Sequence, residues 1–354
     1  MEQSLQIKWS TKAICPPAKD WFDWSTIPTF CHDPLDQALS WPTGTTEALR
    51  RSFELKLSRS SGWTVENHPQ KDCLEKAAQV FKRGVPLSTK SDMETSGEYS
   101  IDFMETWTPT KDCLIVIDPK VASLWSITSG PKTILFEIDE KTKTLESVAY
   151  LKELITQSKA PQHEPLVIIG GGVLADTASF CASLMNRKFI LVPTTLLAMI
   201  DACVGGKTGV NFPPYGKNQL GLFSFPEKVI ISKHWLQTLP SRQLNAGLSE
   251  AFKHALILGS RALAHLAAAG TEDLNAFLEN IVNFVEVKKS IVEKDPMELG
   301  VRSVLNFGHT LAHAIEAISH ETSDLEYVYH GEAVGIGMLF ASYLSHRLGY
   351  LSFE

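Results

Sequence analysis

Three histidines and one glutamate in the second half of the chain have types and spacing suited to metal chemistry. His309 and His313 are four residues apart in NFGHTLAHAIE, so on a helix they share one face. His330 opens YHGEAVGIGM, and Glu250 lies inside LSEAFKHA. One carboxylate with two or three imidazoles suits zinc and leaves a position open for a substrate oxygen. The spacing leaves open whether His313 or His330 completes the set.

The surroundings of these histidines favour a ligand role over an accidental spacing. A lone HxxxH pair on an exposed helix is more often fortuitous. Here, however, apolar and glycine-containing segments flank the histidines, where an unpaired imidazole would cost free energy. Lys253, Lys288 and Arg302 would add positive charge around the metal, although each alone is typical of a surface residue.

Two glycine-rich segments could bind anions. VIIGGGVLAD (167–176) runs from an apolar strand through three glycines into a helix, so a phosphate could approach the N–H groups of the helix N-terminus. A tight turn needs glycine for steric reasons alone, so both interpretations stay open. GGKTG (205–209) is not a P-loop, because Asp201 stands where that motif needs glycine. The polar groups around GGKTG predict a loop that either grips an anion or polyhydroxyl compound or is a solvated turn: Asp201, Lys207, Thr208, Asn211, Lys217 and Asn218.

The elements that must position these residues change type along the chain. Short β-branched runs at 113–118, 132–138, 165–170 and 188–193, with helical patterns such as 145–155 between them, predict βαβ units and a parallel sheet. After the strand pattern at 228–232, helical spacing recurs at 244–258, 274–292, 310–318 and 333–348. We therefore expect an α/β fold in which a Rossmann-like parallel-sheet domain precedes an all-helical C-terminal domain. The expected divisions are 1–112 (N-terminal extension and first α/β elements), 113–237 (α/β core) and 238–354 (helical domain).

Composition excludes several classes of protein. The 354 residues are 44% hydrophobic and 21% charged, as in globular proteins, and the net charge of −7 argues against nucleic-acid or anionic-membrane partners. The six cysteines form no CxxC pair, which fits a reducing cytoplasm. The N-terminus lacks an apolar signal region, and the apolar stretch 189–200 is too short and interrupted to span a bilayer. We expect a cytoplasmic protein that binds neither nucleic acid nor a membrane.

Between about residues 113 and 349 the chain contains six ordered blocks: GGGVLADTASF, VPTTLLAMIDACVGGKTGVN, GKNQLGLF, TLPSRQLNAGLSEAFKHALI, VRSVLNFGHTLAHAIE and HGEAVGIGM. Together these blocks resemble the 3-dehydroquinate synthase family of sugar phosphate cyclases. The resemblance implies a homodimer that uses NAD and Zn²⁺ or Co²⁺ on a phosphorylated keto-sugar. It also implies a reaction of transient oxidation, phosphate elimination, reduction and intramolecular aldol closure, in which NAD is regenerated.

The resemblance assigns residues to three roles. It implies that the metal ligands are Glu250, His309 and His330, which leaves His313 to help hold the substrate phosphate. The residues it places around the substrate are Asp201, Lys207, Asn218, Lys253, Lys288, Arg302 and Asn306. The residues it assigns to NAD are Asp118, Glu140, Lys143, Gly170, Gly171, Gly172, Asp176, Thr194 and Thr195, and we group Lys217 with them.

The same matches favour one substrate. Arg302, Asn306 and His313 resemble the enzymes that take a carboxylated heptulosonate, since a guanidinium fits a carboxylate in a bidentate way. This favours conversion of 3-deoxy-arabino-heptulosonate 7-phosphate to 3-dehydroquinate. The alternatives are a sedoheptulose 7-phosphate cyclase of the 2-epi-5-epi-valiolone synthase type, an aminodehydroquinate synthase, an NAD- and metal-dependent alcohol dehydrogenase of the glycerol dehydrogenase type, and a non-catalytic relative.

The chain departs from the family pattern in four places. Residues 210–218 are one residue longer than usual, and 185–189 are shorter, which makes Arg187 a stand-in for a phosphate-binding arginine. The N-terminal region is longer than in the plain synthase. The family normally continues past the position of Glu354 through further helices that include another phosphate-binding lysine. We therefore expect a truncated chain or a divergent relative that has lost part of its site.

Overall fold

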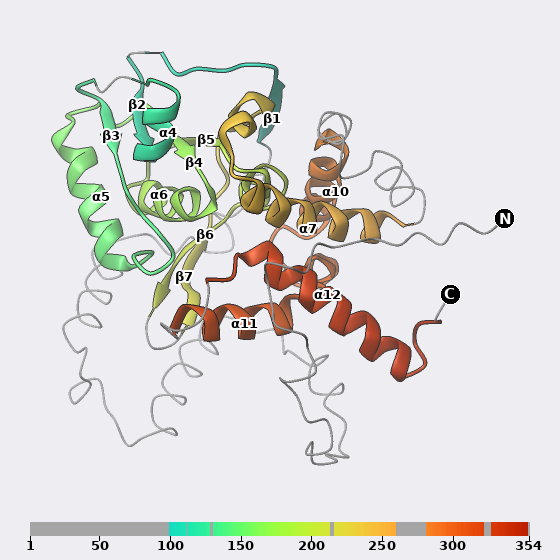
Figure 1. Cartoon of the computed structure of the whole chain (residues 1–354). Helices are drawn as coiled ribbons and strands as arrows, with labels where there is room; N and C mark the ends of the chain where they lie inside the picture. Colours follow the sequence, from blue (N-terminus) through green and yellow to red (C-terminus); the bar gives the residue numbers. More distant parts are fainter. Residues whose placement is uncertain are drawn as a thin grey trace, which may run out of the picture. The chain divides into compact units, whose positions relative to one another are not determined.

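The computed structural model describes residues 99–110, 112–127, 130–212, 216–259, 281–321 and 327–352 (Figure 1). The chain divides into two units, Met1–Lys76 and Ala77–Glu354, and all of the described residues lie in the second. Most of the predicted N-terminal division, residues 1–98, therefore lies outside the described part of the chain.

A six-stranded parallel sheet organises the first part of the described chain. Its spatial order is β1-β8-β5-β4-β2-β3, and each neighbouring pair is parallel. The strands are β1 (Ser100–Met104), β2 (Leu114–Ile117), β3 (Thr133–Leu135), β4 (Leu166–Gly170), β5 (Phe189–Pro193) and β8 (Lys228–Ser232). The interior strands β2 and β4 are apolar and buried along their whole length, as expected when elements cover both faces of a sheet. The α/β fold predicted from the β-branched runs is confirmed.

The order of the strands reverses between β2 and β4. From β2 the chain moves outward to β3, and then returns through helix α5 (Leu145–Gln157) to β4 on the other side of β2. Ligands of open α/β sheets bind where the order reverses, outside the carboxyl ends of the strands. Asp118 follows β2 and Gly171 follows β4 at this point.

Two helices begin at these strand ends. Helix α4 (Pro119–Leu124) has proline in its first turn, and the Oδ1 atom of Asp118 accepts from Lys120 N and Val121 N at 2.8 and 3.1 Å. Helix α6 (Gly172–Leu184) begins inside the glycine turn, and most of its residues are buried. The side chain predicted to contact NAD at position 118 is therefore also a helix cap.

The loop predicted around GGKTG is wrong, because the structure has a β-hairpin there. Strands β6 (Lys207–Phe212) and β7 (Gly216–Phe223) pair in antiparallel fashion. Gly209 and Gly221 face one another across the pair, where a Cβ on either would crowd the backbone of the opposite strand. Glycine is generally unfavourable inside strands. The two glycines that allow the close strand pairing therefore made this segment look like a loop in the sequence. Asp201, grouped with this loop, instead lies in η5 (Ala198–Ala202), a π-helix.

The described residues after β8 form helices and the loops that connect them, without a further strand. They contain η6 (Lys233–Thr238), α7 (Ser241–Leu258), α10 (Ile281–Lys294), η7 (Val301–Asn306), α11 (His309–Glu321) and α12 (His330–Arg347). These helices confirm the predicted periodic segments, except that residues 274–280 lie outside the described part. None of the described helices has the length and apolarity needed to cross a bilayer. The predicted domain divisions at 112 and 237 remain predictions.

Two glycines of α12 allow close contact with its neighbours. A Cβ at Gly331 would overlap the carbonyl oxygen of Ala246 in α7, and one at Gly337 would overlap the carbonyl oxygen of Gly308 before α11. Gly308 has φ +82°, which disfavours any other residue there. These contacts bring the start of α12 against α7 and α11, the helices that carry Glu250 and His309.

Candidate active site

A cavity of about 860 Å³ is lined by the ends of the parallel strands, the hairpin and the helices that follow. Every residue assigned to the metal, the substrate or NAD lines it except Gly170, which is buried within β4, and Glu250, which is fully buried in α7. The structure therefore brings together segments separated by more than 200 positions in the sequence. The predicted roles of these residues remain predictions.

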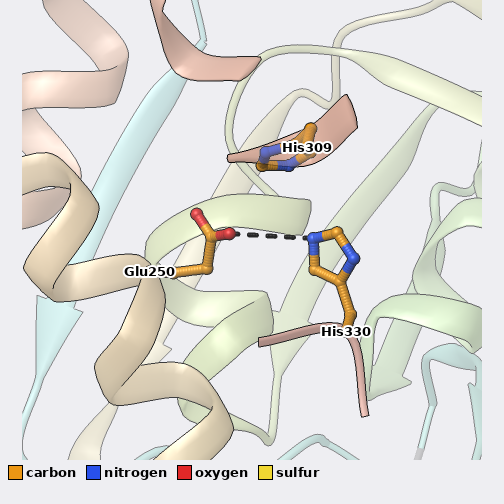
Figure 2. A group of neighbouring side chains, drawn as sticks. All are labelled: Glu250, His309 and His330. Carbon is orange, nitrogen blue, oxygen red and sulfur yellow. Dashed lines mark ion pairs between the residues drawn. The ribbon is translucent and has the colours of Figure 1, made fainter. Parts of the chain in front are cut away.

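The three predicted metal ligands lie around one point. One ligand atom from each of Glu250, His309 and His330 lies within 4.8 Å of the other two. Figure 2 shows the Glu250 carboxylate and the two imidazole rings converging from three separate segments, with Glu250 Oε1 3.7 Å from His330 Nε2. The ring of His313 lies 5.5 Å from the His309 ring and lines the cavity next to this cluster.

His330 directs its Nε2 atom toward Glu250, and the Nδ1 atom of each clustered histidine lies near an acceptor oxygen. The Nδ1 atom of His309 lies 3.3 Å from Phe307 O, and that of His330 lies 3.3 Å from Glu316 Oε1. Because both oxygens only accept, each Nδ1 carries the proton. Burial, with a contribution from the charge of Lys253, lowers the pKa of His309 to about 4, so this ring is neutral at pH 7. Neutral imidazole is the form that binds metals.

The buried carboxylate of Glu250 fits a metal ion. Its side chain is fully buried, and neither oxygen has a hydrogen bond of good geometry. The Lys253 ammonium lies against Oε2, whereas Oε1 has no hydrogen-bond donor and lies 3.7 Å from His330 Nε2. A buried carboxylate oxygen without a donor is costly unless a cation pairs with it. The donor set, one carboxylate and two imidazoles, is the kind that zinc and cobalt accept.

A second group of charges lies directly behind this cluster. Lys288 of α10 donates to Asp201 Oδ1 at 2.7 Å and to Asp201 O at 2.6 Å. Burial alone would raise the pKa of Asp201, but Lys288 and Lys253 hold it well below the usual range. Burial lowers the pKa of Lys288, and Asp201 offsets only part of this effect. A buried lysine with a lowered pKa inside a cavity is a candidate for proton transfer or for binding an anionic ligand.

The strand-end side of the cavity has its own buried ion pair. Lys143 is 3% exposed and donates to Asp176 Oδ2 at 2.6 Å and to Asn218 Oδ1 at 2.7 Å. Asn218 belongs to the hairpin, where its φ is +51°. Glu140 accepts from Asn211 Nδ2 at 2.9 Å, also in the hairpin. The predicted NAD residues thus join the sheet to the hairpin.

Three residues predicted to bind the substrate have protein partners in this structure. Arg302 is 2% exposed and donates to Pro296 O at 2.7 Å and Gly205 O at 2.8 Å. Lys207 pairs with Glu298, and Asn306 donates to Glu298 Oε1 at 2.8 Å. The Glu298 carboxylate therefore binds Lys207 and Asn306, two side chains that the sequence predicts to bind an anionic substrate. Arg302 keeps three further N–H donors beyond the two used here.

Sequence reasoning missed two carboxylates of the cavity. Glu316 follows His309 by seven residues and His313 by three, spacings that would have placed it on their helix face. Glu298 had no comparable signal, because it lies between helices. Arg187 does not line the cavity. Its guanidinium donates to Pro161 O and Glu164 O at 2.8 and 2.6 Å, so the expected stand-in for a phosphate-binding arginine is instead a structural residue.

Comparison with known proteins gives matches along most of the described chain. Residues 133–246 match the family described as 3-dehydroquinate synthase N-terminal, and residues 247–354 match 3-dehydroquinate synthase C-terminal. A 3-dehydroquinate synthase of Campylobacter hominis is 37% identical over 268 residues, which cover 73% of this chain and 76% of the relative. One from a Sulfurovum species is 38% identical, covering 75% and 77%.

Two solved structures of sugar phosphate cyclases are also similar. ValA, a 2-epi-5-epi-valiolone synthase of Streptomyces hygroscopicus with NAD⁺ and Zn²⁺ bound, is 28% identical with a TM-score of 0.64, covering 71% of this chain and 76% of its own. A 2-deoxy-scyllo-inosose synthase complexed with carbaglucose-6-phosphate, NAD⁺ and Co²⁺ is 27% identical with a TM-score of 0.60, covering 71% and 74%.

Proposed function

The chain belongs to the 3-dehydroquinate synthase family, and we propose that it is a carbon–oxygen lyase that eliminates phosphate from a carboxylated keto-sugar phosphate and closes the product into 3-dehydroquinate. The observation that carries the proposal is the convergence of Glu250, His309 and His330 in a cavity that also reaches the glycine turn after β4. A metal centre beside a dinucleotide site is what this chemistry needs.

Two cofactors belong to the proposal. Glu250, His309 and His330 would hold Zn²⁺ or Co²⁺, which when bound stabilises negative charge developing on substrate oxygens. The N-terminus of α6 and the strand ends would hold NAD, which when bound accepts a hydride and returns it. The solved relatives with NAD⁺ and Zn²⁺ or Co²⁺ support both assignments.

The protein's own groups have three tasks in this proposal. The turn of Gly171 and Gly172 leaves backbone N–H groups at the start of a helix, where an anion is favoured. The Lys143–Asp176 pair restrains the hairpin against that turn. Lys288, with its lowered pKa, and Asp201 are placed to move or stabilise a proton near the substrate.

Arg302 supports a carboxylated substrate over a neutral sugar. Its guanidinium is held by two backbone carbonyls, so it is already oriented, and its remaining donors are free for a planar anion. Asn306 and Lys207 line the same part of the cavity, where Glu298 now accepts from them. A substrate carboxylate or phosphate would replace Glu298 as their partner.

Purified protein with NAD and Co²⁺ tests the proposal. We expect phosphate release from 3-deoxy-arabino-heptulosonate 7-phosphate and none from sedoheptulose 7-phosphate. Release from sedoheptulose 7-phosphate alone would indicate a valiolone-type cyclase instead. Net NADH accumulation with glycerol, without phosphate release, would indicate an alcohol dehydrogenase and would contradict the proposal.

Two properties of the proposed enzyme need separate measurements. We propose a homodimer in the cytoplasm, without a nucleic-acid or membrane partner. Light scattering should give twice the chain mass of 39.2 kDa. A monomer in solution, or a membrane-bound fraction in cells, would contradict these expectations without affecting the reaction.

A further inference from the structure

Glu316 is a buried carboxylate that none of the assigned roles includes. It lies on α11 on the face that carries His309 and His313, and it is 1% exposed. An ionised carboxylate at such a position is unfavourable unless specific partners compensate it. The groups around Glu316 must therefore stabilise its negative charge.

The partners of Glu316 come from two other elements. Its Oε1 atom accepts from Lys217 Nζ of β7 at 3.0 Å and lies 3.3 Å from His330 Nδ1 of α12. The Lys217 ammonium pairs with the Glu316 side chain as with an ionised carboxylate. A carboxylate can only accept hydrogen bonds.

This contact determines which nitrogen of His330 faces the metal site. With Nδ1 directed to Glu316, the Nε2 atom of His330 faces the side where Glu250 Oε1 lies 3.7 Å away. Carboxylates that accept from the second nitrogen of a metal-binding histidine fix its tautomer and its ring orientation. His309 has only a backbone carbonyl, Phe307 O, in the same position.

Lys217 connects Glu316 to Glu140, one of the residues predicted to bind NAD. Besides its bond to Glu316, its ammonium lies 3.4 Å from Glu140 Oε1. The side chain is 26% exposed, so the pair with Glu316 is shielded from solvent only in part. A chain of contacts Glu140–Lys217–Glu316–His330 therefore joins the hairpin to the metal cluster.

We infer that Glu316 is a positioning residue that orients His330 for the metal ion, and that Lys217 holds it in place. This inference rests on the proposed metal site. It predicts that loss of the Glu316 carboxylate weakens metal binding without changing the ligands themselves.

Direct metal titration tests this role. Apo protein is titrated with Zn²⁺ against a chromophoric chelator, and with Co²⁺ by its visible absorption. For Glu316→Ala we expect metal affinity to fall about 10- to 100-fold, with an altered Co²⁺ spectrum. Glu316→Gln should fall between wild type and Glu316→Ala, because the amide oxygen still accepts from Nδ1–H without a charge. Glu286→Gln, a largely exposed glutamate on α10, is the control and should bind as wild type does.

The stability of the apo protein separates positioning from general structure. We expect the apo variants to unfold within a few degrees of wild type. Wild-type metal affinity in folded Glu316→Ala would overturn the inference. If that variant does not fold, an unchanged affinity and spectrum in Glu316→Gln would do so.

The outcome is distinguishable from that of the proposed function. Tight Co²⁺ binding by the wild type, weakened in Glu316→Ala but without phosphate release from any sugar phosphate, would reject the function and support the positioning role. Phosphate release by the wild type together with unchanged metal affinity in Glu316→Ala would support the function and reject the positioning role.

Discussion

On the sheet side of the cavity, Asp118, Gly171 and Thr194 each follow a parallel strand directly, whereas on the helical side the clustered ligand atoms come from three helices. The carboxyl ends of neighbouring strands must meet at one edge, so the sheet alone brings the first group together. The second group depends on how α7, α11 and α12 pack. The two sides should therefore respond differently to mutation: one through local nucleotide contacts, the other through contacts between helices.

The largest expected effect concerns Glu250, the proposed metal ligand whose side chain is fully buried. Glu250→Gln replaces a buried carboxylate with a weak ligand, and we expect Co²⁺ affinity to fall on the order of 1000-fold. NAD affinity, measured by fluorescence titration without metal, should change less than about threefold, because the strand ends are untouched. Wild-type Co²⁺ affinity in this variant would contradict the assignment of Glu250.

A smaller loss of stability and metal affinity should follow from a substitution that separates helices α12 and α7. In Gly331→Ala the new Cβ would overlap Ala246 O, so α12 must move away from α7. We expect a decrease of about 3 kcal/mol in the free energy of unfolding by urea, and metal binding about tenfold weaker.

Gly335→Ala is the matched control on the same helix. Its Cβ would meet only the Ser249 side chain, with Oγ nearest at 3.3 Å, and a small shift of that side chain relieves the contact. Equal stability of the two variants would show that the close contact at Gly331 does not hold the helical side of the site together.

The sheet side is altered most directly at Lys143. Lys143→Met leaves Asp176 without its cation and frees Asn218 of the hairpin. We expect NAD affinity to fall about tenfold while the Co²⁺ dissociation constant of the apo protein stays unchanged. The exposed neighbour Lys141 gives the control, Lys141→Met. Equal losses for both cofactors would mean that the two sides are not independent.

The smallest expected effect is a pH-dependent change in folding stability when Asp295 is substituted. Asp295 accepts from Leu299 N, Gly300 N and Arg302 N at the start of η7. Burial alone would raise its pKa, but these bonds hold it below the usual value. Because the folded pKa is the lower one, the extra stability is present above the unfolded pKa of about 3.9 and is lost as pH falls through the folded pKa.

The variant Asp295→Asn tests that dependence. We expect it to be about 1 kcal/mol less stable than wild type at pH 7, with the difference shrinking below about pH 4. Urea unfolding at pH 7, 5 and 3 measures the difference. A gap that widens toward pH 3 would contradict the assigned direction of the pKa shift.

Where local pattern determines structure, the sequence was sufficient. The parallel sheet and the helices of the second half follow from runs of β-branched residues and from 3.6-residue periodicity, both of which act within ten or so neighbours. The glycine turn after β4 could be located for the same reason. The hairpin of β6 and β7 could not, because its glycines serve contacts across the pair that no local pattern records.

The convergence of Glu250, His309 and His330 was decided by the tertiary structure. Their spacing in the sequence was compatible with His313 or with His330 as the third member, and only packing at Gly331 and Gly337 places the start of α12 beside α7 and α11. The contacts of Glu316 and Glu298 could not be predicted from the sequence either. Each joins elements far apart in the chain, and such contacts depend on helix orientations that are set by the whole core and not by any one segment.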